Sequence, residues 1–139
     1  MFNGRLEEAV TFYSSVFTDA KVENVSDQSA TFELCGQRFL AFNGGDHFSF
    51  SDGISLFVDC ADQQEVDFYW EKLSANGGEK GYCGWLKDAF GVSWQVIPKA
   101  LGEYLGGEDK AGASRAMEAM LKMTKIEVEV LKNAYAGTN

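Results

Sequence analysis

The feature that most constrains this chain is a repeat within its own sequence. Residues 8–13 align with residues 64–69, and three residue types recur 56 positions apart: Val10 and Val66, Phe12 and Phe68, Tyr13 and Tyr69. Two turn glycines, Gly36 and Gly91, each precede a strand-like run and lie 55 positions apart. Aromatic helix faces can resemble one another by chance, but the matching turn glycine favours duplication. The repeat therefore predicts two modules with the same fold.

Three segments have the apolar spacing of amphipathic helices. Residues 6–17 carry apolar side chains at helical intervals, with two glutamates in the first turn. A second helix is predicted from an N-cap at Asp62 to about residue 75, where residues 76–78 supply a glycine-rich stop. A third is predicted over residues 108–123. The pattern of residues 125–136 fits a strand or a short helix equally well.

Strand-like runs separated by turn residues fill the chain between these helices. They are residues 21–26, 30–34, 37–43, 54–60, 84–87 and 92–97. The order of strand, helix and further strands occurs twice. We therefore predict an α+β fold with two tandem βαβββ modules, residues 1–45 and 53–98, in a single domain that ends in a helical extension over residues 99–139. The opening strand of the first module is truncated to a stub at residues 1–4, which either leaves a short edge or is paired by a partner chain.

Composition and charge disfavour several classes of function. The chain has 139 residues, the length of one ordinary domain, and 12 basic against 21 acidic side chains give a net charge of −9. An acidic surface repels phosphate backbones and anionic lipid, so we expect no nucleic-acid and no membrane partner. The three cysteines form no CxxC pair, and residues 1–5 lack the apolar core of a signal peptide. We expect a cytoplasmic protein with reduced thiols.

Several segments resemble one branch of a known superfamily, and together they span nearly the whole chain. They are residues 7–17, 39–45, 54–60, 65–70, 83–88, 90–96 and 117–123, of which residues 90–96 are the most specific. The chain resembles the PhnB-like branch, labelled 3-demethylubiquinone 3-methyltransferase-like, of the vicinal oxygen chelate superfamily. That superfamily includes glyoxalase I, extradiol dioxygenases and bleomycin-resistance proteins. The resemblance implies that the two modules form a curved, open mixed sheet.

The resemblance also implies a homodimer. Two features of the sequence fit this expectation, because each leaves surface that needs covering. One is the short opening strand. The other is an apolar face on the third predicted helix, formed by Met117, Met120, Leu121 and Met123.

In metal-using members of the superfamily, four metal ligands come from the first and last strands of the two modules. The resemblance implies the same four positions in this chain. Carried onto this sequence, the first position lies before or within residues 1–3, the second at Leu40 or Ala41, and the third at Ile54 or Ser55. None of these residues is a strong metal ligand. The fourth falls on Gln95, whose neutral amide is a weak ligand without imidazoles or carboxylates beside it. We therefore expect no metal cofactor. A rebuilt divalent-metal site would use Gln95 and the chain's one histidine, His47.

An apolar pocket with a few polar side chains is the default expectation for a ligand site. The candidate residues lie on or beside the strands of both modules: Gln95, His47, Asn43, Phe42, Ser93, Tyr82 and Trp85. Core packing explains most of the aromatic residues without a ligand. His47, beside Asp46, could be a metal ligand or a general base, or it could be a linker or interface residue between the two modules. Cys60 and Cys83 fit small buried hydrophobes, and no residues for catalysis are identified.

The leading hypothesis is a small-molecule-binding protein of the glyoxalase and bleomycin-resistance superfamily, without the inherited metal site. The alternative is a metal-dependent enzyme, of lyase, dioxygenase or isomerase type, acting on a small oxygen-rich metabolite. A purely structural or interaction role is a third possibility. The methyltransferase label of the branch has no support in a cofactor motif, because the sequence contains no G-x-G-x-x-G or comparable strand-to-helix loop.

Overall fold

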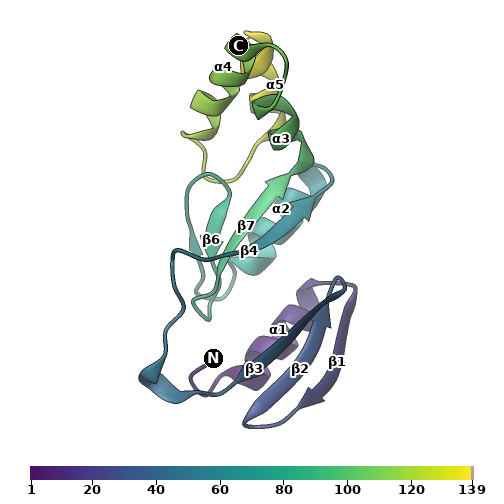
Figure 1. Ribbon diagram of the computed structural model, residues 1–139, viewed down its shortest axis with the longest axis vertical. Helices are drawn as coiled ribbons and strands as arrows, with labels where there is room; N and C mark the ends of the chain where they lie inside the picture. The colour runs from purple at the N-terminus through teal and green to yellow at the C-terminus, as the bar shows by residue number, and fades with distance from the viewer. Residues whose placement is uncertain (139) are drawn as a thin grey trace. The chain divides into compact units, whose positions relative to one another are not determined.

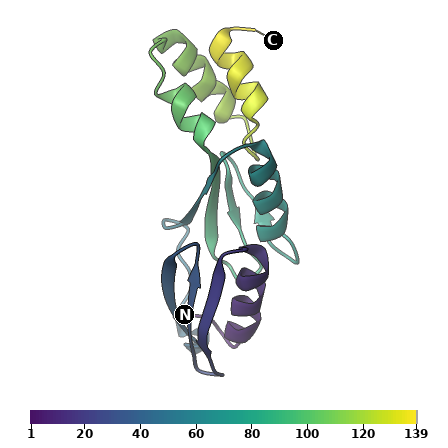
Figure 2. The same ribbon diagram turned by 90° about the vertical axis from the view of Figure 1, so that its right-hand side faces the viewer.

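A computed structural model describes residues 1–138 and divides the chain into two compact units, Met1–Ser51 and Asp52–Asn139. Each unit contains one open sheet with a helix on one face, and the second also contains the helical extension (Figures 1 and 2). The units are described separately below. No helix among the described residues has both the length and the apolar character needed to cross a bilayer.

The first unit is a βαβββ module whose opening strand is only a bridge. Its antiparallel sheet has the order β1-β2-β3. Phe2 forms an isolated parallel bridge to Asn43, just beyond the end of β3. The elements are α1 (Leu6–Val16), β1 (Ala20–Val25), β2 (Ser29–Leu34) and β3 (Gln37–Phe42).

The helix of the first unit buries the side chains that its sequence spacing indicates. The whole predicted stripe is buried: Leu6, Ala9, Val10, Tyr13, Val16 and Phe17. The ring of Tyr13 stacks on Phe32 of β2, with centroids 6.4 Å apart, and Phe32 stacks on Phe39 at 5.4 Å. This packing fixes which face of the sheet α1 covers.

The second unit repeats the same topology with a complete opening strand. Its sheet has the order β4-β7-β6-β5, in which β4 is parallel to β7 and the other pairs are antiparallel. The elements are β4 (Leu56–Cys60), α2 (Gln63–Leu73), β5 (Glu79–Lys80), β6 (Trp85–Lys87) and β7 (Ser93–Pro98). The pairing of β4 with β7 corresponds to the bridge between Phe2 and Asn43. The predicted α+β fold with two βαβββ modules and a helical extension is confirmed, with one open sheet in each unit.

Local hydrogen bonds explain where α2 begins and how β7 is entered. The Asp62 carboxylate accepts from the Glu65 backbone N–H at 3.0 Å, as the predicted N-cap requires. Before β7, the buried Asp88 accepts from the backbone N–H groups of Phe90 and Val92 and from Trp94 Nε1. The Trp94 bond is 2.9 Å long. Asp88 therefore anchors the turn within the most family-specific segment.

The helical extension differs from the sequence-based expectation in two ways. It contains three helices, α3 (Lys99–Leu105), α4 (Lys110–Met120) and α5 (Val128–Ala136). The sequence pattern did not indicate α3, and the predicted helix over residues 108–123 is shorter, as α4. The ambiguous segment over residues 125–136 is helical from Val128.

The buried face of α4 differs in part from the predicted one, which comprises Ala113, Ala116, Met117, Met120 and Leu121. Ala116 is buried and Met120 packs against the core, and Gly112 is buried as well, whereas Met117 and Leu121 are 41% and 61% exposed. A side chain at Gly112 would meet the Tyr135 carbonyl oxygen at 2.7 Å, so α4 packs on α5 through its small residues. Close approach of two helices at small residues, rather than the largest apolar side chains, decided the orientation.

The extension is fastened to the rest of the second unit through α2. The Gln63 side-chain amide donates to the Ile126 carbonyl at 3.0 Å and accepts from the Val128 N–H at 2.7 Å. Lys125 Nζ lies 2.7 Å from Asp67 Oδ1, and the hydrogen bond from Lys125 holds the pKa of Asp67 below its ordinary value. These contacts make the extension part of the second unit.

Candidate functional site

One sheet face of the second unit lies away from α2. Helix α2 contacts β4, β6 and β7 on the other face, where Val58, Trp94 and Val96 are buried. Side chains alternate between the faces of a strand, so neighbouring positions point away from α2. The register aligns Phe57, Gln95 and Trp85 in one row across β4, β7 and β6, and Lys87 with Ser93 in the next. We call these five residues the open face.

Gln95 lies in the middle of the first row and is held in place. Its Nε2 donates to Ser55 Oγ at 2.8 Å, and its side chain is partly buried. A carboxamide has a second N–H and a carbonyl oxygen, so one such bond leaves further hydrogen-bonding capacity. Phe57 beside it is 58% exposed. The row therefore combines an oriented polar group with exposed aromatic surface.

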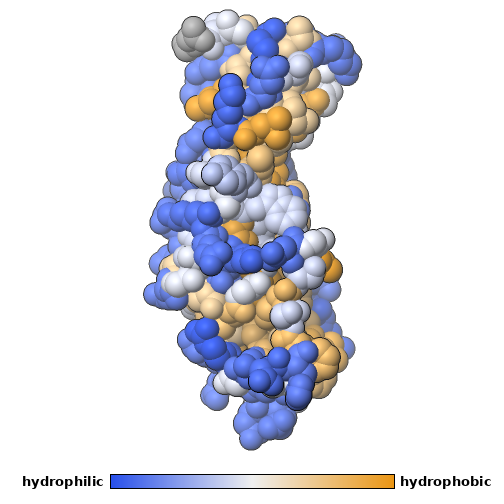
Figure 3. Space-filling model, turned by 90° about the vertical axis from the view of Figure 1, so that its left-hand side faces the viewer, coloured by the Kyte–Doolittle hydropathy of each residue, from blue (hydrophilic) through white to orange (hydrophobic). Residues whose placement is uncertain are grey.

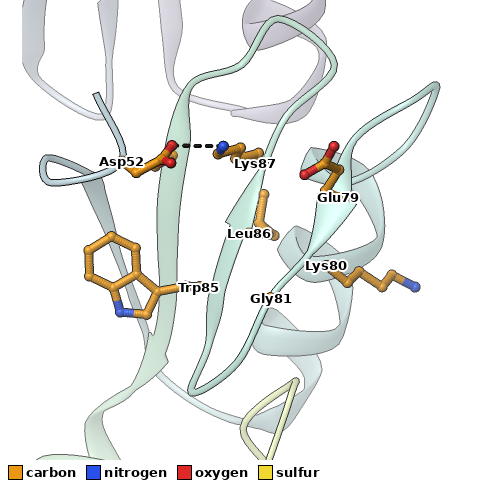
Figure 4. Close-up of a pocket in the computed structure, with 8 residues that line it drawn as sticks. Asp52, Glu79, Lys80, Gly81, Trp85, Leu86 and Lys87 are labelled. Atoms are coloured by element: carbon orange, nitrogen blue, oxygen red, sulfur yellow. Dashed lines mark ion pairs between the residues drawn. The ribbon is translucent and has the colours of Figure 1, made fainter. Parts of the chain in front are cut away.

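A pocket of about 190 Å³ opens beside this face (Figure 4). Its lining combines charged, apolar and small residues: Asp52, Glu79, Lys80, Gly81, Trp85, Leu86, Lys87 and Ser93. In Figure 4 the Trp85 ring lies on the same side of β6 as the ion pair between Asp52 and Lys87, while Lys80 points away. The pocket therefore has an apolar wall and a charged end.

The charged end is formed by one ion pair. Lys87 Nζ lies 2.7 Å from Asp52 Oδ1. The Lys87 side chain is 38% exposed and that of Asp52, in the turn before β4, is 77% exposed. The hydrogen bond and negative charge of Asp52, with a smaller contribution from Glu79, raise the pKa of Lys87 above its ordinary value. Lys87 therefore presents a positive charge at neutral pH.

Four of the seven predicted site residues lie in the second unit. Trp85 and Ser93 line the pocket, and Gln95 is paired with Trp85 in the strand register. Tyr82 precedes the turn into β6 and is 72% exposed, and it does not line this pocket. The strand register therefore brings three of the four candidates, Gln95, Trp85 and Ser93, onto one face.

The other three candidates lie in the first unit. His47 is exposed in a short 3₁₀ helix, η1 (Gly45–His47), and Phe42 is 45% exposed. Both ends of the Asn43 amide are engaged locally. Its Oδ1 accepts from the Leu6 N–H at 3.2 Å, at the start of α1, and its Nδ2 donates to the Asp27 carbonyl at 2.7 Å. Asn43 thus stabilises the fold of its own unit.

The sequence reasoning missed Lys87, Asp52 and Phe57. Lys87 was detectable in principle, because it follows Trp85 at the two-residue spacing that places both on one face of a strand. Phe57 could be found by the same alternation along β4. Asp52 lies in a turn, where no periodicity indicates which strand it reaches.

The positions carried over from metal-using relatives hold no cluster of ligands. Leu40, which the repeat aligns with Gln95, is 62% exposed, and Ser55 is the hydrogen-bond partner of Gln95. Within residues 1–138, no three His, Cys, Asp or Glu side chains are grouped so that they could hold a metal ion. The Cys60 thiol is buried, and desolvation, followed by the nearby acidic groups with Glu65 first, raises its pKa to about 12. Cys60 is therefore a protonated core residue.

Comparison with known proteins identifies the family. The family model described as 3-demethylubiquinone-9 3-methyltransferase matches residues 1–97. A putative 3-demethylubiquinone-9 3-methyltransferase, the PhnB protein from Bacillus cereus, is 32% identical, with a TM-score of 0.64 over 70% of this chain and 94% of that one. Protein PA1353 from Pseudomonas aeruginosa shares the fold at 19% identity, with a TM-score of 0.57 over 70% of this chain and 91% of that one. No curated protein matches.

The sequence resemblance is thereby confirmed. The family match ends at residue 97, so α3, α4 and α5 lie beyond it, whereas the open face and its pocket lie within it. The chain belongs to the 3-demethylubiquinone-9 3-methyltransferase family, the PhnB-like branch of the vicinal oxygen chelate superfamily.

Proposed function

We propose that this protein binds a small organic molecule on the open face of its second unit. The observation that carries the proposal is the pocket formed by Trp85, Lys87 and Ser93 beside the oriented amide of Gln95. Ligand sites typically combine apolar walls with a few placed polar groups, and this face has both.

The size of the pocket limits the ligand. Pockets for drug-sized molecules span roughly 300–1,000 Å³, and this one has a volume of about 190 Å³. A small metabolite with one ring or a short chain fits that volume. Its apolar part would lie against the Trp85 ring, and its polar part at Lys87.

The proposal assigns binding and no reaction. The description of the family names a methyltransferase. The sequence holds no glycine-rich strand-to-helix loop of the kind that binds a nucleotide-containing cofactor. A role in binding needs only the groups described above.

A ligand screen on the purified full-length protein tests the proposal. We expect at least one member of a panel of small aromatic and aliphatic acids, amides and alcohols to raise Tm and to give ligand-observed NMR signals of binding. The same response should be lost in Trp85→Ala, because that side chain forms the apolar wall.

The control is Phe68→Ala, which removes another large aromatic side chain. Phe68 is 43% exposed and lies on α2, the helix that packs on the other face of the sheet. The Phe68→Ala variant should bind as the unmodified protein does, and circular dichroism should show both variants folded. A panel without any binder, or binding that survives Trp85→Ala, would refute the proposal.

A further inference from the structure

We infer that the pocket takes a small monocarboxylate, whose carboxylate replaces that of Asp52 on Lys87 while its apolar part lies against Trp85. This inference rests on the proposed function and names the chemical class of the ligand. It follows from what Lys87 binds in the structure, from the placement of Trp85, and from the charges around the pocket.

Lys87 already binds a carboxylate. Its Nζ and Asp52 Oδ1 are 2.7 Å apart, the distance of a charge-assisted hydrogen bond. The Asp52 side chain is 77% exposed and projects from a turn before β4. An exposed ion pair contributes little to stability, because water and salt compete with it and two side chains must be ordered. The Asp52 carboxylate therefore occupies the position of a ligand carboxylate, and a ligand can displace it from Lys87.

The residues of β6 supply a second point of contact. Trp85 and Lys87 are two positions apart, so their side chains leave the same face of the strand. In Figure 4 the indole ring lies on the side of the ion pair. Ser93, opposite Lys87 in the register, also lines the pocket, and its hydroxyl can donate to a carboxylate. A carboxylate at Lys87 thus places its attached group over Trp85.

The remaining charges select a single negative group. Glu79 lies opposite Lys87 in the register of β5 and β6. Lys80, the other cation of the lining, is paired with Glu71 at 3.0 Å and points away from the pocket. A ligand with one carboxylate pairs with Lys87 in place of Asp52 and leaves the Asp52 side chain, which is 77% exposed, to water. A second carboxylate would meet Glu79 without a cation to compensate it.

Two variants of the ion pair test the inference with phenylacetate as the probe and its neutral analogue phenylacetamide as the comparison. In isothermal titration at low salt, Lys87→Gln should bind phenylacetate about tenfold more weakly or worse, since a charge-assisted bond is lost. Asp52→Asn should bind it about two- to fivefold more tightly, because the competing carboxylate is gone. Neither variant should alter the binding of phenylacetamide.

Lys132→Gln is the control for net charge. Lys132 lies on α5 and pairs with Glu129 at 3.7 Å, away from the pocket lining. It should bind phenylacetate as the unmodified protein does. Equal affinity in Asp52→Asn and the unmodified protein, or undiminished affinity in Lys87→Gln, would overturn the inference.

Two results of the binding experiments distinguish a failure of this inference from a failure of the proposed function. Suppose that neutral compounds bind and that Trp85→Ala abolishes their binding, while Lys87→Gln leaves the affinity for phenylacetate unchanged. That result would overturn the inference but not the proposed function. The absence of any binder in the whole panel would overturn both.

Discussion

At the scale of single residues, Asp88 shows how one buried carboxylate organises the segment that leads into the candidate site. It is 3% exposed and accepts hydrogen bonds from two backbone N–H groups and from Trp94 Nε1. The strand that follows carries Ser93 and Gln95 onto the open face. The turn anchored by Asp88 therefore sets the register on which the face depends.

Removing this carboxylate should be costly. We expect Asp88→Ala to lower the free energy of unfolding by about 2–4 kcal/mol, because buried N–H donors lose their partner. Urea denaturation measures the loss. The control is Asp46→Ala, at an exposed position of η1, which should change stability by less than about 0.5 kcal/mol. Equal effects from the two substitutions would contradict the role given to Asp88.

Strand alternation predicts which residues share a sheet face, but it says nothing of the contacts that a turn makes. Ser93 and Gln95, two positions apart on β7, share a face with Trp85 of β6, and their role in binding a ligand stays a prediction. Asp52 was missed because its contact with Lys87 depends on the path of a turn. Asn43 was considered for a ligand, but its amide is used at the start of α1.

At the scale of elements, the helices of the extension show how space around small residues directs packing. A side chain at Gly102, which is exposed on α3, would meet no atom within 4 Å. A side chain at Gly112, on the buried face of α4, would meet the Tyr135 carbonyl oxygen at 2.7 Å. The two glycines therefore differ in function although both lie in helices.

The same substitution should act in opposite directions at these two positions. Gly102→Ala should raise the free energy of unfolding by about 0.5–1 kcal/mol, because alanine has the higher helix propensity. Gly112→Ala should lower it by about 1–3 kcal/mol, because α4 and α5 must move apart. Thermal and urea unfolding of both variants measure the difference. A stabilising Gly112→Ala would contradict the packing described for the extension.

Element prediction succeeded where the apolar pattern was long and failed where packing overrode it. The apolar stripe of α1 was predicted in full, because its positions repeat at helical spacing. All five of its residues within α1 are buried. The pattern of α4 favoured a face that contains Ala116, Met117, Met120 and Leu121. With α5 approaching at Gly112, Ala116 is buried and Met120 packs against the core, but Met117 and Leu121 are exposed. The segment that forms α5 was too short for periodicity to separate helix from strand.

At the scale of the whole molecule, the homodimer stays a prediction, and the exposure of single side chains shows which residue to substitute to test it. Met120 is packed against the core of the extension, so changing it would disturb folding. Leu121 is 61% exposed, and apolar surface is visible between hydrophilic side chains of the extension at the top of Figure 3. If this face forms the interface, a charge at Leu121 should separate the subunits.

We expect analytical ultracentrifugation to give a dimer that Leu121→Glu dissociates. Lys122→Glu is the control, because it adds the same charged side chain at an exposed neighbouring position that is already polar. A dimer unaffected by Leu121→Glu would place the interface elsewhere. A monomeric unmodified protein would contradict the homodimer itself.

The duplication accounts for the whole-molecule architecture that the sequence could predict. The repeat and the family resemblance indicated two βαβββ modules, and both sheets have that topology. The pocket was not predictable in the same way, because it depends on a turn, on three neighbouring strands and on an ion pair between the turn and β6.

The measurement that tests the central claim most directly is a two-dimensional ¹H–¹⁵N NMR titration of the full-length protein with phenylacetate. Ligand binding on the open face predicts saturable shift changes concentrated at the amides of Trp85, Lys87, Ser93 and Gln95, with the indole N–H of Trp85 among them. Saturable changes confined to the first unit or to the helical extension would contradict the account, as would a spectrum that phenylacetate and every other member of the ligand panel leave unchanged.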